Sequence, residues 1–209
     1  GPIPFNKEQH NKIAIYPASR LSVYICQHGV DFISGTIAHS NYEFFLPLGN
    51  TLPLLKIGRQ NRAAEYNHLF PFNPEQAHGL SRAQPELYFL DIIVDKDFLD
   101  HICTLIYNRS EVCFYSENTP WTDNLNLLVE SFAKESMNHQ TGQAFVLDCL
   151  SSQIVVELLR NVRNNMPRAA DGRPYQAKEN IKRAMEYLRE HYNRQFCLTD
   201  VAQVANLSP

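Results

Sequence analysis

The sequence has no long run of apolar residues. Its longest such stretches, LDIIV (90–94) and AFVLDCL (144–150), are far shorter than the roughly 20 residues that a membrane-spanning helix needs. The first residues also lack the basic start and apolar core of a signal peptide. We therefore expect neither insertion into a membrane nor export, and predict a cytoplasmic protein.

Cysteine is sparse and unpaired in sequence. There are five cysteines, an odd number, and no C-x-x-C pair occurs among Cys26, Cys103, Cys113, Cys149 and Cys197. This spacing fits neither a disulfide framework nor a cysteine-based zinc site. Reduced thiols in a cytoplasmic protein are the simplest interpretation.

The sequence also lacks the common catalytic signatures. It has no G-x-S-x-G elbow, no phosphate-binding glycine loop, no H-E-x-x-H and no dinucleotide fingerprint. Asp95 and Asp97 are typical of the first turn of a helix rather than of an acid–base pair. We therefore predict no enzymatic activity and no cofactor.

Short runs of aromatic and β-branched residues, separated by Gly, Pro and Asn, occupy the first part of the chain. LSVYIC, YEFFLPL, PLLKIG, LFPF and ELYFLDIIV have the length and spacing of antiparallel strands. Residues 95–107 keep helical spacing. The expected fold class is α+β, with an antiparallel barrel over residues 1–120.

Two helices are predicted over residues 121–165. Thr122 is a suitable cap for the first, and residues 143–164 form the longest periodic segment. The apolar residues of that segment cover a wide arc, so one stripe could face a second copy of the chain or lie inside a single domain. The residues expected at such a dimer interface are Leu147, Leu150, Ile154 and Leu158.

Residues 166–209 differ from the rest of the chain in net charge and in the placement of proline and glycine. Residues 166–178 contain prolines and a glycine that predict a linker, and residues 179–209 begin with an amphipathic helix followed by a short second one. Net charge is −7 for residues 1–159 and +4 for residues 160–209. Such a basic end suits the approach to a polyanion, and suits a solvated helix equally well.

Three segments carry a resemblance to a known family. The end of the chain, IKRAMEYLREHYNRQFCLTDVAQVANLSP (181–209), resembles the start of the DNA-binding domain of AraC/XylS-type bacterial transcription regulators. HSNYEFFLPLGN (39–50) and LFPFNPEQAHG (69–79) are similar to the cupin-like effector domain of that family. The family has an N-P-G-x-x-H segment there, and Glu75 stands here in place of its glycine.

The resemblance implies a cupin-like, jelly-roll barrel that binds a small molecule, a helical hairpin that makes a homodimer, and helix-turn-helix units that bind DNA. Ser208 and Pro209 would open the next helix. We therefore expect the chain to stop before the recognition helices, so that it would not bind DNA specifically by itself. Lys182, Arg183 and Ser208 would lie near DNA in the intact protein.

The candidate ligand site is built around a strand and a later histidine. His39, Asn41 and Glu43 alternate in sequence, so that they would share one strand face, and His78 could join them inside the barrel. Further candidate contacts are Phe45, Lys56, Tyr66 and Tyr88.

Two alternatives to a ligand sensor remain open. Imidazoles and a carboxylate also suit a transition metal, so a small metal-dependent cupin enzyme could use His39, Glu43 and His78. Asn41, however, stands where cupin enzymes have a second histidine, and an amide is a poor ligand. A dimerisation module without any ligand is the third possibility. The sequence does not identify an effector, the target promoters, or whether the regulator activates or represses.

Overall fold

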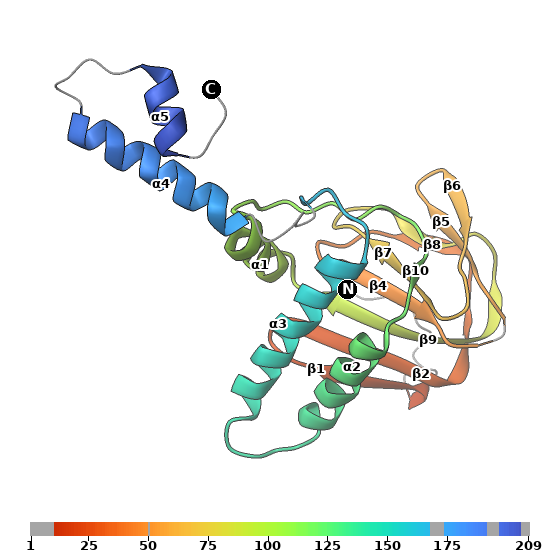
Figure 1. Cartoon of the computed structure of the whole chain (residues 1–209). Helices are drawn as coiled ribbons and strands as arrows, with labels where there is room; N and C mark the ends of the chain where they lie inside the picture. The colour runs from red at the N-terminus through yellow and green to blue at the C-terminus, as the bar shows by residue number, and fades with distance from the viewer. Residues whose placement is uncertain (1–10, 50, 168–173, 192–196, 206–209) are drawn as a thin grey trace. The chain divides into compact units, whose positions relative to one another are not determined.

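The computed structural model of the chain describes residues 11–49, 51–167, 174–191 and 197–205 (Figure 1). The chain divides into two compact units, residues 1–166 and 167–209. The first contains all the strands and three helices, and the second contains two helices.

The strands of the first unit form two antiparallel sheets. The six-stranded sheet has the order β1-β2-β9-β4-β7-β10 and the four-stranded sheet the order β3-β8-β5-β6. Their bounds are β1 Ile13–Pro17, β2 Leu21–Phe32, β3 Gly35–Ile37, β4 Tyr42–Pro47, β5 Leu54–Ile57, β6 Gln60–Ala63, β7 His68–Phe72, β8 His78–Leu80, β9 Gln84–Val94 and β10 Thr119–Pro120.

The antiparallel architecture expected from the short strand runs is confirmed, but the closed barrel is not. Among the described residues, the two sheets are separate hydrogen-bonded units. The four-stranded sheet ends at β6, whose four residues are all exposed. Among the described residues, β6 pairs only with β5, so no hydrogen-bonded ladder joins this edge to the six-stranded sheet.

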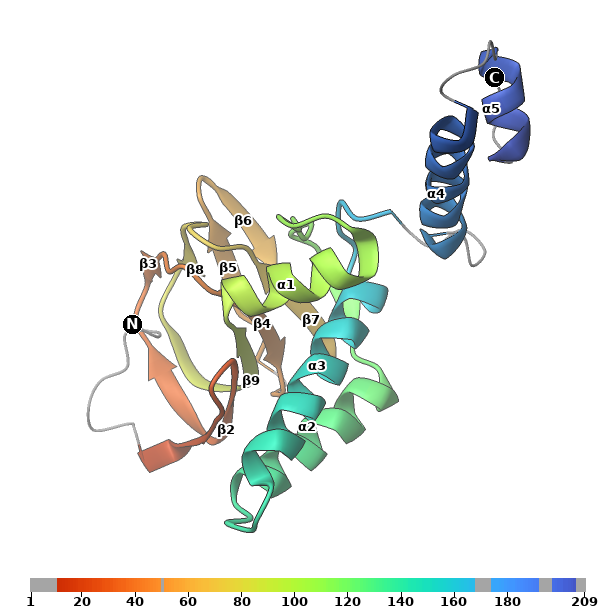
Figure 2. The same cartoon turned by 90° about the vertical axis from the view of Figure 1, so that its left-hand side faces the viewer.

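Strand β4 lies at the centre of the fold, since all six of its residues are buried. Tyr42, Phe44 and Leu46 belong to the apolar core under the helices, and Phe45 belongs to a second core on the opposite face of the sheet. Successive side chains of a strand point to opposite faces, so β4 separates the two cores. Figure 2 shows the three helices of the first unit on one side of this sheet and the strands β3, β5, β6 and β8 on the other.

Three helices, α1 (Lys96–Tyr107), α2 (Asp123–Ser136) and α3 (Gln143–Asn161), cover the first core. The Asp95 carboxylate accepts a hydrogen bond from the Phe98 backbone N–H at 2.9 Å, and the Thr122 hydroxyl accepts one from Leu125 at 3.2 Å. Both predicted helix starts are thus confirmed, with Asp95 acting as a cap.

The apolar stripe of α3 that we expected at a dimer interface lies instead in the core of its own chain. Leu147, Ile154 and Leu158 are buried, and Leu150 packs against the same core. This corrects the sequence interpretation: α3 is apolar over a wide arc because it contacts both α2 and α1. The exposed apolar residues of α3 are Phe145 and Val146, which are 73% and 41% exposed.

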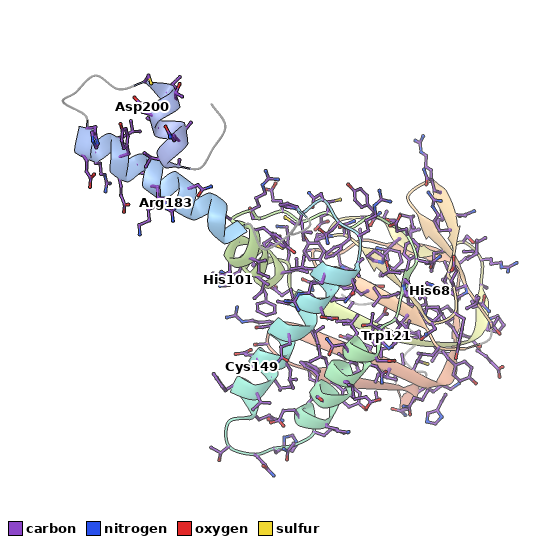
Figure 3. All side chains as sticks on the ribbon, in the orientation of Figure 1. His68, His101, Trp121, Cys149, Arg183 and Asp200 are labelled. Carbon is purple, nitrogen blue, oxygen red and sulfur yellow. The ribbon has the colours of Figure 1, made fainter. Side chains whose placement is uncertain are left out.

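The second unit contains α4 (Pro174–His191) and α5 (Leu198–Val204). Helix α4 begins inside the segment predicted as a linker, because proline is well accepted at the first position of a helix. Arg183 is exposed on α4 (Figure 3), as is Lys182, whose Nζ lies 3.9 Å from Glu186 Oε1. Ser208 lies outside the described residues. In the part of the chain that the structure describes, no helix is long and apolar enough to span a bilayer.

Candidate functional site

A cavity of about 60 Å³ lies at the inner face of the six-stranded sheet. Most of its lining is apolar and includes Phe32, Phe45, Leu55, Phe72, Leu87 and Phe89. Three ionisable side chains, those of Glu43, His78 and Asp91, also line it. Buried polar groups in an otherwise apolar cavity are typical of a site that orients a small ligand.

Glu43 holds two histidines from different parts of the chain. Its Oε2 atom accepts hydrogen bonds from His39 Nε2 at 2.8 Å and from His78 Nε2 at 3.2 Å. The side chain of His78 is 3% exposed, that of Glu43 5% and that of His39 11%. The sequence predicted a site from His39, Asn41, Glu43 and His78. The structure brings together the side chains of three of them, His39, Glu43 and His78.

The turn before β8 brings the two histidines together. Glu75 has a φ of 60°, in the left-handed region, and its backbone N–H donates to the His39 carbonyl oxygen at 2.8 Å. The Gln76 N–H closes the turn on the Asn73 carbonyl at 3.1 Å. The left-handed backbone conformation that glycine adopts most readily is therefore present here with a glutamate, at some conformational cost.

Backbone carbonyls fix the other edge of each imidazole. His39 Nδ1 lies 3.1 Å from the Asn41 oxygen, and His78 Nδ1 lies 2.6 Å from the Gln76 oxygen. Each ring thus faces an acceptor at both nitrogens, and it can donate to both only when both carry protons. A ring that carries one proton donates to only one of its two acceptors.

The ionisation of Glu43 and His78 reflects this pairing. Burial would raise the pKa of Glu43, but the hydrogen bonds from His39 and His78 outweigh it and lower the pKa. Burial would likewise lower the pKa of His78, but the hydrogen bond and the charge of Glu43 raise it. The pair is therefore stabilised as a buried ion pair.

The same three residues have the donor set of a metal centre. One ligand atom from each of His39, Glu43 and His78 lies within 4.8 Å of the others. Two imidazoles and a carboxylate suit a divalent transition metal, and Nδ1 atoms that donate to carbonyls would leave both Nε2 lone pairs for it. The three residues therefore fit such an ion, and among the described residues the cluster contains no fourth ligating side chain.

Asp91 is the residue of the cavity that sequence reasoning missed. It lies on β9, is 0% exposed, and neither of its carboxylate oxygens has a hydrogen-bond partner among the described residues. Burial raises its pKa well above the ordinary value, and the charge of Glu43 raises it further. The available signal was a single acidic residue inside the apolar run LDIIV, two positions from Phe89.

The other predicted contacts lie away from the cavity. Strand β4 begins after Asn41, which offers its backbone oxygen rather than its amide to His39. Lys56 is exposed because it alternates with the inward-facing Leu55, and Tyr66 is 59% exposed in the turn before β7. Tyr88 alternates with Leu87 and Phe89, so it is directed to the other face of the sheet. Of the additional candidates, only Phe45 lines the cavity.

Comparisons with known proteins give distant likenesses. No family model and no curated protein matches the sequence. Among solved structures, the AraC-like transcriptional activator CuxR is similar over 94% of this chain and 70% of that chain, at 10% identity and a TM-score of 0.44.

Two other similar structures cover less of this chain. A putative mannose-6-phosphate isomerase from Ralstonia eutropha JMP134 is similar over 40% of this chain and 82% of that one, with 9% identity and a TM-score of 0.32. KdgF from Halomonas sp. is similar over 43% and 92%, with 13% identity and a TM-score of 0.31. Likenesses at these scores assign neither a family nor an activity, so we rest the proposed function on the residues of this chain.

Proposed function

We propose that this chain is the small-molecule-sensing and dimerisation region of a ligand-responsive transcription regulator of the AraC type. The observation that carries the sensing role is the cavity beside β4. It combines apolar walls with a buried carboxyl group, that of Asp91, which has no hydrogen-bond partner among the described residues. A buried polar group without a partner is costly, and a bound ligand that supplies the partner removes this cost.

The regulatory role is supported by the second unit. The sequence that resembles the start of an AraC-type DNA-binding domain contains the end of α4 and the whole of α5. Lys182 and Arg183 are exposed on α4. In the intact protein these cations would attract the DNA backbone without reading its sequence, and that attraction would weaken with salt.

The mechanism that we propose is thermodynamic linkage. An effector that binds one arrangement of the first unit more tightly than another shifts the population toward it. Because linkage is reciprocal, DNA bound by the intact protein would change the affinity for the effector by the same factor. No catalytic step is part of this proposal.

The proposed homodimer would use a surface other than the buried stripe of α3. The exposed apolar residues of the helical hairpin include Leu127 on α2 and Phe145 and Val146 on α3, with exposures of 62%, 73% and 41%. Exposed apolar residues of this size are the expected anchors of a protein interface.

Native mass spectrometry of the purified chain tests the proposal, with identification of whatever denaturation releases. We expect a dimer that carries one organic molecule per chain. Leu80→Phe adds a ring to the cavity wall and should abolish the bound molecule, whereas the matched Leu105→Phe, on an exposed position of α1, should retain it. A wild-type chain that binds no organic compound, as purified or from a metabolite panel, would contradict the sensing role.

A metal-dependent enzyme is the second candidate function, because His39, Glu43 and His78 fit a divalent ion. When bound, such an ion would act as a Lewis acid toward a substrate in the cavity. The residues of the chain would hold it, and the carbonyls of Asn41 and Gln76 would orient the two imidazoles. Stoichiometric iron, manganese or zinc in the purified chain, lost in His78→Ala, would favour this candidate over the sensor.

A further inference from the structure

Asp91 lies on the floor of the cavity in the middle of β9. In the sheet register it pairs with Tyr24 of β2 on one side and with Phe45 of β4 on the other. The side chains that share its face on β9 are apolar, since Leu87 and Phe89 also line the cavity. The carboxyl group therefore lies beside apolar side chains, with no described hydrogen-bond partner for either oxygen.

Glu43 lies on the same sheet face but has partners of its own. Its register partner on β9 is Ile93, so Asp91 is its diagonal neighbour, at a separation of about 7–8 Å between Cα atoms. The two imidazoles at Oε2 offset the charge of Glu43. The group in the cavity that lacks a compensating charge and a donor is thus Asp91.

We propose that the cavity binds a small organic cation, a primary ammonium on a short aliphatic chain, with the ammonium N–H groups donating to Asp91 and the chain against the phenylalanines. This inference rests on the proposed sensing function and names the ligand class of the same site.

Three features favour a cation over other small ligands. A carboxylate ligand would bring like charge to Glu43 and would not offset the charge of an ionised Asp91, and an alcohol would supply one donor but no charge. An ammonium supplies three donors and the counter-charge, and charge-assisted hydrogen bonds are about twice as strong as neutral ones. The rings of Phe45 and Phe89, stacked with centroids 5.9 Å apart, also present faces that attract cations.

The size of the cavity limits the chain length. A volume of about 60 Å³ is several times the roughly 10–15 Å³ that one buried water needs. We therefore expect an amine of about four heavy atoms to fit without large movement of the walls.

Calorimetric titration of the full chain with three ligands of similar size tests the ligand class. Propylammonium chloride should bind at least about tenfold more tightly than propan-1-ol or sodium propionate. Asp91→Asn should remove this preference, because it keeps the shape of the side chain and loses its charge. The matched Asp123→Asn, at an exposed position on α2, should keep it.

The remaining outcomes separate the ligand class from the sensing function. Equal or tighter binding of propan-1-ol or propionate would overturn the cation while leaving a small-molecule site in place. If none of the three binds, the cation is overturned, and the molecule released in native mass spectrometry decides whether the cavity is a sensor. If Asp91→Asn does not fold, NMR measurement of the Asp91 carboxyl ¹³C resonance in the wild-type chain takes the place of this variant. Propylammonium should shift this resonance to the carboxylate position, and an unchanged resonance would overturn the proposal.

Discussion

Replacing Glu75 by glycine should stabilise the first unit. Glu75 has a φ of 60°, and its side chain is exposed. For a residue with a Cβ, the left-handed conformation costs about 1–2 kcal/mol, a cost that glycine does not have. Glycine in turn gains about 0.4–1 kcal/mol of entropy in the unfolded chain. The difference predicts a net stabilisation of about 0.5–1 kcal/mol.

The effect can be measured through the single tryptophan of the chain. Trp121 lies just before α2 (Figure 3), so its fluorescence reports unfolding of the first unit. For a unit of this size, the expected gain corresponds to a rise in Tm of about 1–4 °C. Urea denaturation followed at Trp121 gives the change in free energy directly.

The control is Glu75→Ala, which removes the same side chain but keeps a Cβ. It should give no comparable gain, because the backbone strain persists. If Glu75→Gly were no more stable than Glu75→Ala, the strain assigned to this turn would be refuted. The bond from the Glu75 N–H to the His39 carbonyl would then be formed without measurable cost.

Three further substitutions test the site and the interface. Glu43→Gln should destabilise the first unit by about 3 kcal/mol in urea denaturation, because the buried imidazole of His78 loses its counter-charge. Glu65→Gln, at an exposed pair, should cost under about 1 kcal/mol, and equal losses would contradict the buried ion pair. Because the pKa of Asp91 is raised in the folded state, the folded chain keeps the Asp91 proton to a higher pH than the unfolded chain does. The free energy of unfolding of the wild type should therefore fall relative to that of Asp91→Asn as pH rises above about 4. Parallel pH profiles of the two proteins would refute this prediction. Phe145→Lys should shift the native mass from dimer to monomer, whereas the control Leu105→Lys on α1 should not. A dimer that survives in Phe145→Lys would place the interface elsewhere.

Local sequence patterns predicted much of the fold. The short aromatic and β-branched runs of residues 13–94 correspond to strands because alternation and turn residues are local properties. The caps Asp95 and Thr122 were predictable for the same reason. The separation of the strands into two sheets was not, since pairing between β4 and β9 joins residues far apart in the chain.

The candidate site was predicted in part. His39, Glu43 and His78 could be found because a polar residue beside aromatic strand residues is conspicuous, and the structure brings them together. Asp91 was hidden within the apolar run LDIIV, where a single acidic residue does not change the strand pattern. Lys56 was a candidate on the condition that its side chain faced inward, and the strand instead turns Leu55 inward and leaves Lys56 exposed; a shift of one residue in a strand reverses this choice.

Strand β4 is buried on both faces, and this burial has a mechanical consequence. Phe45 of β4 lines the cavity, whereas Phe44 packs edge-on against Phe114 with ring centroids 5.0 Å apart. Phe114 in turn pairs with Asn164, close to Met166, where the first unit ends. We expect a displacement of β4 by cavity contents to reach, through these closely packed rings, the point where the chain leaves the first unit.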